Sequence, residues 1–137
     1  MSGFEAFLKQ NKKQDETMKF AASMSFTDKN GKPLEWEIRP LKSKEAAAIR
    51  KLTNKIGKGG RVDVDNETFN RMAAAKATVF PDLNDKELQD SYGVMCAEDL
   101  IVEMLDKDGE FQEYVKNVMA VSGYNITDTE LVKEAKN

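Results

Sequence analysis

The fold of this chain is decided by residues 18–38, which read MKFAASMSFTDKNGKPLEWEI. Apolar residues fall on even positions and polar residues on most of the odd ones, a period typical of strands with one buried face. Between the two halves, Asn30-Gly31 accepts the positive φ of a tight turn. The pattern predicts an antiparallel β-hairpin with Trp36 buried on its inner face. The alternating apolar residues are Met18, Phe20, Ala22, Met24, Phe26, Leu34, Trp36 and Ile38.

Downstream of the hairpin, apolar residues recur at intervals of three and four, which predicts amphipathic helices. The first is expected over residues 44–56, with Ser43 as its N-cap and Gly57 at its end. The second is expected to follow Asp65 or Asn66. Because a hairpin alone is marginally stable in water, these helices should cover its apolar face. Their apolar positions are Ile49, Leu52, Ile56, Phe69, Met72, Ala73 and Ala77.

Two further apolar stripes predict a helical hairpin near the C-terminus. The break at Asp108-Gly109 separates them, and a connection this short makes consecutive helices antiparallel neighbours. Gly123 is expected to end the second helix with a left-handed cap. The stripes are Ala97, Leu100, Ile101, Met104 and Leu105, then Phe111, Tyr114, Val115, Val118 and Met119.

Capping-box spacing, with an acidic residue three positions after the cap, predicts two short helices. Asn84 with Glu87 marks one, and Thr127 with Glu130 marks a last one that begins near Asp128.

The expected fold class is α+β, with an N-terminal antiparallel β-hairpin packed on a mostly α-helical domain that ends in a C-terminal helical hairpin. A strand near residues 61–64 or 79–80 is a candidate to extend the hairpin's sheet. Residues 17–137 have the length of one domain. Residues 1–16 are expected to form an N-terminal amphipathic segment and a polar linker.

The N-terminal segment contains the first candidate binding residues. Phe4, Phe7 and Leu8 have the spacing of one helical face. An isolated helix this short is unstable without a surface to bury it, so the segment should dock either on its own domain or on a partner. Near the C-terminus, Leu131 and Val132 are the second candidate pair for binding a partner.

Catalytic and metal chemistry find little support in the composition. The chain has no histidine, and its single Cys96 cannot form an internal disulfide. Cys96 is expected to be a small buried thiol at a helix start. The acidic run Asp106, Asp108 and Glu110 has only part of a calcium loop, which favours a turn between helices. No catalytic residue, metal or cofactor is predicted.

Charge is divided unevenly along the chain. Residues 1–68 contain 14 basic and 10 acidic residues, whereas residues 69–137 contain 7 basic and 14 acidic ones.

Residues 57–61 are glycine-rich and basic but lack the phosphate-loop pattern, so they are expected to form a flexible loop between helices. The basic cluster has no interleaved aromatic residue for base stacking, which argues against nucleic-acid binding. That cluster consists of Arg50, Lys51, Lys55, Lys58 and Arg61.

With 40% hydrophobic and 33% charged residues, the composition is that of a globular protein. No apolar stretch approaches the length of a membrane span, and the N-terminus does not resemble a secretory signal. A cytoplasmic location is expected.

An ordered series of short segments runs through the second half of the chain, with a weaker extension upstream. The later segments are Pro81-Asp82-Leu83, Glu87-Leu88, Tyr92-Gly93-Val94, Gly109-Glu110-Phe111, Gly123-Tyr124 and Glu134-Ala135-Lys136-Asn137. The earlier ones are Trp36-Glu37-Ile38-Arg39-Pro40-Leu41, Glu45 and Ile49-Arg50. In this order and spacing, the series resembles the XkdN-like family of tail assembly chaperones of tailed bacteriophages and prophages.

The resemblance implies a non-enzymatic protein that keeps the long, helical tape measure protein soluble while tail tube subunits polymerise around it. The implied partners are the tape measure protein, the tail tube protein and a longer form of the chain made by a programmed −1 frameshift. The implied place is the cytoplasm of the bacterial host, with the protein absent from the mature virion. The alternatives are a structural tail or baseplate component and a small nucleic-acid-binding regulator.

Overall fold

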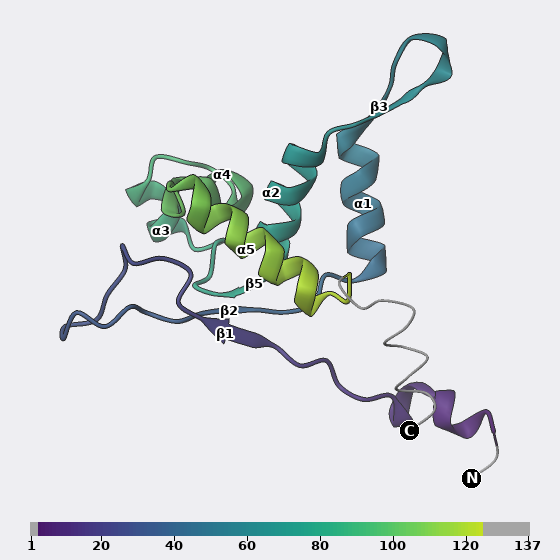
Figure 1. The fold of residues 1–137 in the computed structure, drawn as a ribbon, viewed down its shortest axis with the longest axis horizontal. Helices are drawn as coiled ribbons and strands as arrows, with labels where there is room; N and C mark the ends of the chain where they lie inside the picture. The colour runs from purple at the N-terminus through teal and green to yellow at the C-terminus, as the bar shows by residue number, and fades with distance from the viewer. Residues whose placement is uncertain (1–2, 125–137) are drawn as a thin grey trace.

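The computed structural model describes residues 3–124, and Figure 1 shows a body of helices that covers one face of a small sheet. The fold is α+β, as predicted. In chain order the elements are η1 (Glu5–Phe7), η2 (Lys9–Asn11), β1 (Met18–Phe20), β2 (Trp36–Ile38), α1 (Ser43–Thr53), β3 (Asn54–Ile56), η3 (Lys58–Gly60), β4 (Val62–Val64), α2 (Asn66–Ala77), β5 (Thr78–Phe80), α3 (Lys86–Ser91), α4 (Ala97–Met104) and α5 (Asp108–Val121).

The main sheet has the order β1-β2-β5, with both pairs antiparallel. Phe20 pairs with Trp36 and Met18 with Ile38, which places the apolar residues of the predicted hairpin on one face. Trp36 is 2% exposed, so its predicted burial is confirmed. Of the two candidate third strands, β5 joins this sheet, whereas β4 pairs with β3 in a separate two-stranded ribbon.

The first predicted strand is wrong beyond Phe20, because the chain bulges out between β1 and the turn. Phe20 pairs with Trp36 and Thr27 with Pro33, so the six residues 21–26 lie opposite only residues 34–35. A carboxylate from α5 holds this bulge. Ser23 Oγ donates to Glu110 Oε1 at 2.7 Å and the Met24 amide donates to Glu110 Oε2 at 3.1 Å.

The core forms where the sheet meets α2, α4 and α5. Tyr114 of α5 is wholly buried, and its ring lies edge-on to Trp36 with 5.5 Å between centroids. Its hydroxyl shares a hydrogen bond of 2.6 Å with Thr78 Oγ1 in β5. Burial raises the pKa of Tyr114 above its ordinary value, so this hydroxyl stays neutral. The stripes of the predicted helical hairpin, α4 and α5, both enter this core.

The first helix differs from the prediction at both ends. It begins at Ser43, with Lys42 as the N-cap residue, because Glu45 Oε1 accepts a hydrogen bond of 3.0 Å from the Lys42 amide. It ends at Thr53, and residues 54–56 form β3. Of its three predicted core residues, Ile49 is buried, whereas Leu52 and Ile56 are 69% and 83% exposed.

The remaining helix boundaries agree more closely. Asp65 caps α2 as predicted, since its carboxylate accepts from the Thr68 amide at 3.0 Å. The cap of α3 is Asp85, one residue after the predicted Asn84. Gly123, with φ of 92°, provides the expected left-handed end of α5. The helix predicted near residue 128 lies outside the described residues.

Replacing the central aromatic residue should weaken the fold strongly. We expect Trp36→Ala to lower the free energy of unfolding by about 3–5 kcal/mol, because it removes a buried side chain in contact with Tyr114 and Phe26. Urea unfolding followed by circular dichroism measures the change without the tryptophan signal. The matched control is Met95→Ala, at a side chain 94% exposed, which should change stability by less than about 0.5 kcal/mol. A loss below about 1 kcal/mol for Trp36→Ala would contradict the predicted burial energy.

Candidate functional site

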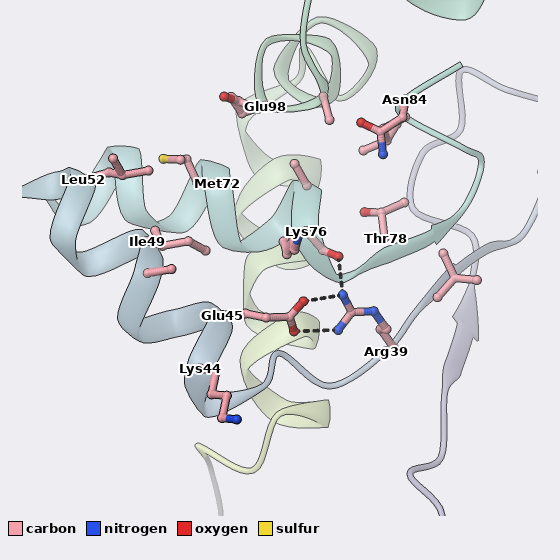
Figure 2. A pocket seen from close by; sticks show the side chains of 15 residues that line it. Arg39, Lys44, Glu45, Ile49, Leu52, Met72, Lys76, Thr78, Asn84 and Glu98 are labelled. Carbon is pink, nitrogen blue, oxygen red and sulfur yellow. Dashed lines mark hydrogen bonds and ion pairs between the residues drawn. The ribbon is translucent and has the colours of Figure 1, made fainter. Parts of the chain in front are cut away.

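A groove of about 880 Å³ lies between α1 and α2. The end of α2, β5, the segment before α3 and the start of α4 complete its walls (Figure 2). The two helices meet through a small second core in which Leu41, Ala46 and Ile49 pack on Ala73. The facing sides of α1 and α2 are therefore packed against each other. The side chains next to this contact line the groove.

An ion pair closes the polar end of the groove. Arg39 follows β2 and binds both carboxylate oxygens of Glu45 in α1, each at 2.8 Å. The same guanidinium donates to the Lys76 carbonyl at 3.1 Å, and Figure 2 shows it pointing into this junction. One side chain thus ties β2, α1 and α2 together.

The pair also sets the ionisation of its members. The hydrogen bond from Arg39 lowers the pKa of Glu45 from 4.5 to about 2, against the opposing effect of burial. The hydrogen bond to Glu45 likewise raises the pKa of Arg39. Both groups remain charged at neutral pH, and their strongest hydrogen bonds are to each other. The pair therefore holds the start of α1 in place beside β2 and the end of α2.

The opposite end of the groove is apolar. Leu52 lies on the rim of α1 and Met72 faces it from α2, as Figure 2 shows. On the side of the groove next to Arg39, whose amide donates to the Ala77 carbonyl at 2.9 Å, β5 contributes Val79, which is 44% exposed. These side chains leave apolar surface in contact with water, which is the usual mark of a binding site for another apolar segment.

The structure places the first predicted binding residues elsewhere. Phe4, Phe7 and Leu8 are 69%, 86% and 37% exposed, and none of them lines the groove. They do not share one helix face, because η1 and η2 are separate 3₁₀ turns with Leu8 extended between them. A single helix this short is unstable, because it forms too few hydrogen bonds to offset its unfavourable nucleation. The other predicted pair, Leu131 and Val132, lies outside the described residues.

The N-terminal segment is tied to the body by polar contacts near its end. Lys42 forms an ion pair with Asp15, and Thr17 Oγ1 donates to Glu37 at 2.7 Å. Figure 1 shows η1 and η2 at one end of the molecule, beyond these ties. The apolar side chains of the segment are therefore exposed in this structure.

Residues considered for chemistry have structural roles. Cys96 is the N-cap residue of α4 and half-buried, and burial raises the pKa of its thiol. Among residues 3–124, no three Cys, Asp or Glu side chains are grouped to hold a metal ion. The acidic run ends in Glu110, whose carboxylate holds the bulge before the hairpin turn. In the same range, no helix has the length and apolar character needed to cross a membrane.

The glycine-rich residues 57–61 form the tip of the β3–β4 ribbon and do not connect two helices as predicted. A strand near residues 61–64 was predicted, but its pairing with β3 in a separate ribbon was not, and neither was the groove. The signal for the ribbon was the alternation of Asn54, Ile56, Val62 and Val64 on either side of the glycines. One member of the basic cluster, Arg50, is engaged: it lies over the Phe69 ring at 5.4 Å.

These features define a small α+β domain with an open groove between α1 and α2. The sequence profile described as phage XkdN-like tail assembly chaperone protein matches residues 4–136, almost the whole chain. This chain therefore belongs to the XkdN-like family of phage tail assembly chaperones.

Two individual proteins are similar to this chain in sequence, and one of them has a solved structure. The chain is 25% identical over 126 residues to the phage-like element PBSX protein XkdN of Bacillus subtilis, covering 89% of this chain and 85% of that protein. It is 22% identical, with the same coverage, to the uncharacterized protein YqbN of the same organism. The crystal structure of YqbN has the same fold, with a TM-score of 0.75 at 18% identity over 90% of this chain and 98% of that one.

Removing the Glu45 carboxylate should make the melting temperature depend less on pH between pH 7 and pH 2. The folded-state pKa of about 2 lies below the ordinary 4.5, so the ion pair stabilises the fold above about pH 4.5 and the effect is lost as the pH falls towards 2. We expect Glu45→Gln to lower the melting temperature at pH 7 and to reduce the difference between pH 7 and pH 2. Thermal unfolding across this range measures both values.

The control for this prediction is Glu113→Gln, at an exposed residue of α5. It should leave the pH profile close to that of the parent chain. If the melting temperatures of the parent chain and of Glu45→Gln changed with pH in the same way, the Arg39–Glu45 ion pair would not contribute to the loss of stability in acid.

Proposed function

We propose that this protein is a non-enzymatic chaperone that binds the tape measure protein of a phage tail and keeps it soluble while the tail tube assembles around it. The family gives the general role, and the groove between α1 and α2 carries the proposal for how the client is held. A tape measure protein exposes long apolar helical stripes before the tube encloses it, which makes it prone to aggregation. An open groove with an apolar end can cover part of such a stripe reversibly.

The size and lining of the groove support a helix as the bound element. Its volume of about 880 Å³ is in the range of clefts that hold several side chains. Leu52 and Met72 flank the apolar end, while the Arg39–Glu45 pair closes the other end. A helix that places apolar side chains at i, i+3 and i+4 would bury them against this wall with its polar face in water.

The exposed N-terminal segment supports a second contact with the client. Phe4 and Phe7 project from 3₁₀ turns, and residues 12–17 have no helix or strand. Two weak contacts joined by a linker bind more tightly together than either alone and still release stepwise. Reversible release agrees with a protein that acts in the host cytoplasm, meets the tail tube protein during assembly and is absent from the mature virion.

Charges placed in the groove should disable the chaperone without unfolding it. We expect Leu52→Glu with Val79→Glu to reduce the soluble fraction of a co-expressed tape measure protein several-fold, because the client would have to bury two carboxylates. Both positions are more than a third exposed, so the variant itself should fold. Deletion of residues 1–11 should produce a smaller loss. Centrifugation of lysates and quantification of the client measure each effect.

The matched control is Met95→Glu, which adds a carboxylate at a position 94% exposed and outside the groove. It should leave client solubility unchanged. A client that stays equally soluble with the groove variant would exclude the groove as its binding site. Mass spectrometry of purified particles tests the remaining part of the proposal, since abundant copies of this chain in virions would identify a structural component instead.

We also propose that a longer form of this chain is made by a −1 frameshift at Ala135-Lys136-Asn137. The genetic code allows GCA AAA AAC here, which contains the heptamer A AAA AAC on which both tRNAs can re-pair after slipping. The longer form would share the groove and add further client contacts. Nucleotide sequencing is the test: we expect this heptamer and an open −1 frame beyond it, and AAG AAT codons would exclude the proposal.

A further inference from the structure

The β3–β4 ribbon has an apolar side that stays exposed to water within residues 3–124. Ile56 pairs with Val62 and Asn54 with Val64, so the three apolar side chains lie on the same side of the ribbon. They are 83%, 57% and 57% exposed, and Figure 1 shows the ribbon projecting beyond α1 and α2. We call Ile56, Val62 and Val64 the ribbon face. Exposed apolar side chains that adjoin one another in this way indicate a surface that contacts another segment.

Helix α1 continues the ribbon face into a concave surface. Ala47, Arg50 and Lys51 have the i, i+3 and i+4 spacing of one helix side. Together with Ile56 and Val62 they line a hollow of about 440 Å³, so α1 forms one wall and the ribbon forms the other. Ala47 is exposed, and its small side chain lets the backbone of another element approach α1 closely.

The charged side chains around this hollow are all basic. Residues 46–62 contain five basic residues and no acidic one, and none of the five forms an ion pair with another residue of the described chain. The next acidic residues are engaged elsewhere, because Asp63 lies opposite Lys55 on the reverse side of the ribbon and Asp65 caps α2. The five basic residues are Arg50, Lys51, Lys55, Lys58 and Arg61.

Apolar and basic side chains together discriminate between possible partners. The same face of a second copy would bring two sets of basic residues together, which is repulsive. A nucleic acid would neutralise the basic residues but leave the ribbon face uncovered, and no aromatic side chain lines the hollow for base stacking. A helix with carboxylates on both sides of an apolar stripe matches the charge and the apolar surface at once, as helices bound in grooves do.

We propose that the ribbon face and the hollow beside it bind an acidic amphipathic helix of another protein. The apolar stripe of that helix covers Ile56 and Val62, and its carboxylates pair with the basic residues of α1 and the ribbon. Helix α1 contributes Leu52 to the groove next to α2 but Lys51 to this hollow, so the two surfaces are distinct. The interface therefore does not depend on client binding in the groove.

Two labelled peptides test the charge selectivity of the full chain. Both have leucine at helical spacing over about four turns, and the flanking positions are glutamate in one and lysine in the other. We expect fluorescence anisotropy to show binding of the glutamate peptide at least about tenfold tighter than that of the lysine peptide, weakening as salt is added. Lys51→Glu with Lys58→Glu should remove this preference.

The matched control for the charge variant is Lys29→Glu with Lys116→Glu, which makes the same change in net charge at exposed positions outside the hollow. It should leave the preference for the glutamate peptide in place. An equal loss of preference in this control would show that the peptide responds to net charge alone, and would overturn the proposal.

A second pair of variants tests the apolar part of the surface. Ile56→Ser with Val62→Ser should weaken binding of the glutamate peptide at least about tenfold, because its leucines would no longer be covered. Both positions are more than half exposed, so the domain should fold, which circular dichroism checks. Val79→Ser, in the groove next to α2, should leave the affinity unchanged.

Several results would overturn the proposal. Equal affinity for the two peptides, or an unchanged affinity of the Ile56→Ser with Val62→Ser variant, would exclude an acidic helix at this surface. A loss confined to Val79→Ser would assign the peptide to the groove, and tighter binding of a single-stranded oligonucleotide would identify a nucleic-acid surface. Self-association of the chain in sedimentation velocity, abolished by the ribbon variant, would identify a second copy as the partner. No tape measure protein is present in these experiments, so their failure leaves the proposed client binding untouched.

Discussion

Close packing on helix α2 is the constraint on which the rest of the structure depends. Four of its alanines, Ala73, Ala74, Ala75 and Ala77, are buried, and side chains of this size let neighbouring elements approach its backbone. Helices α1, α4 and α5 all pack against it. The direct continuation of α2 into β5 then adds the third strand to the sheet, so one element positions both layers of the domain.

The groove follows from this packing. Helix α1 packs on α2 through Ala46 and Ile49 against Ala73, and the Arg39–Glu45 pair holds its start. In the last turn of α1, Arg50 lies over the Phe69 ring of α2, whereas Leu52 stays 69% exposed. A large side chain in place of Ala73 would push the helices apart and remove the contact that shapes the groove. The apolar surface proposed for client binding is thus a consequence of small residues in α2.

The sequence predicted the elements whose pattern is local. Period two in residues 18–38 gave β2, the turn and the buried Trp36, because alternation is a property of neighbouring residues. The bulge at residues 21–26 could not be predicted in this way, since the carboxylate that holds Ser23 comes from Glu110, 87 positions away. The predicted end of α1 was wrong for a related reason. Residues 54–56 satisfy a helical pattern, but Val62 and Val64 offer them a strand partner across the glycine turn.

The groove was harder to predict than the core for the same physical reason. A buried stripe repeats along one helix, whereas the groove joins Leu52, Met72 and Val79 from three elements and depends on the angle between them. Within the described part of the chain, the residues predicted from the sequence to bind a partner were Phe4, Phe7 and Leu8, which have helical spacing and are exposed. Their spacing can be read from the sequence alone, because it does not depend on how other elements pack. Small and separate apolar surfaces agree with the proposed reversible binding of a client. Several weak contacts can release one after another, whereas one large apolar face would bind its partner more permanently or bind other copies of the chain.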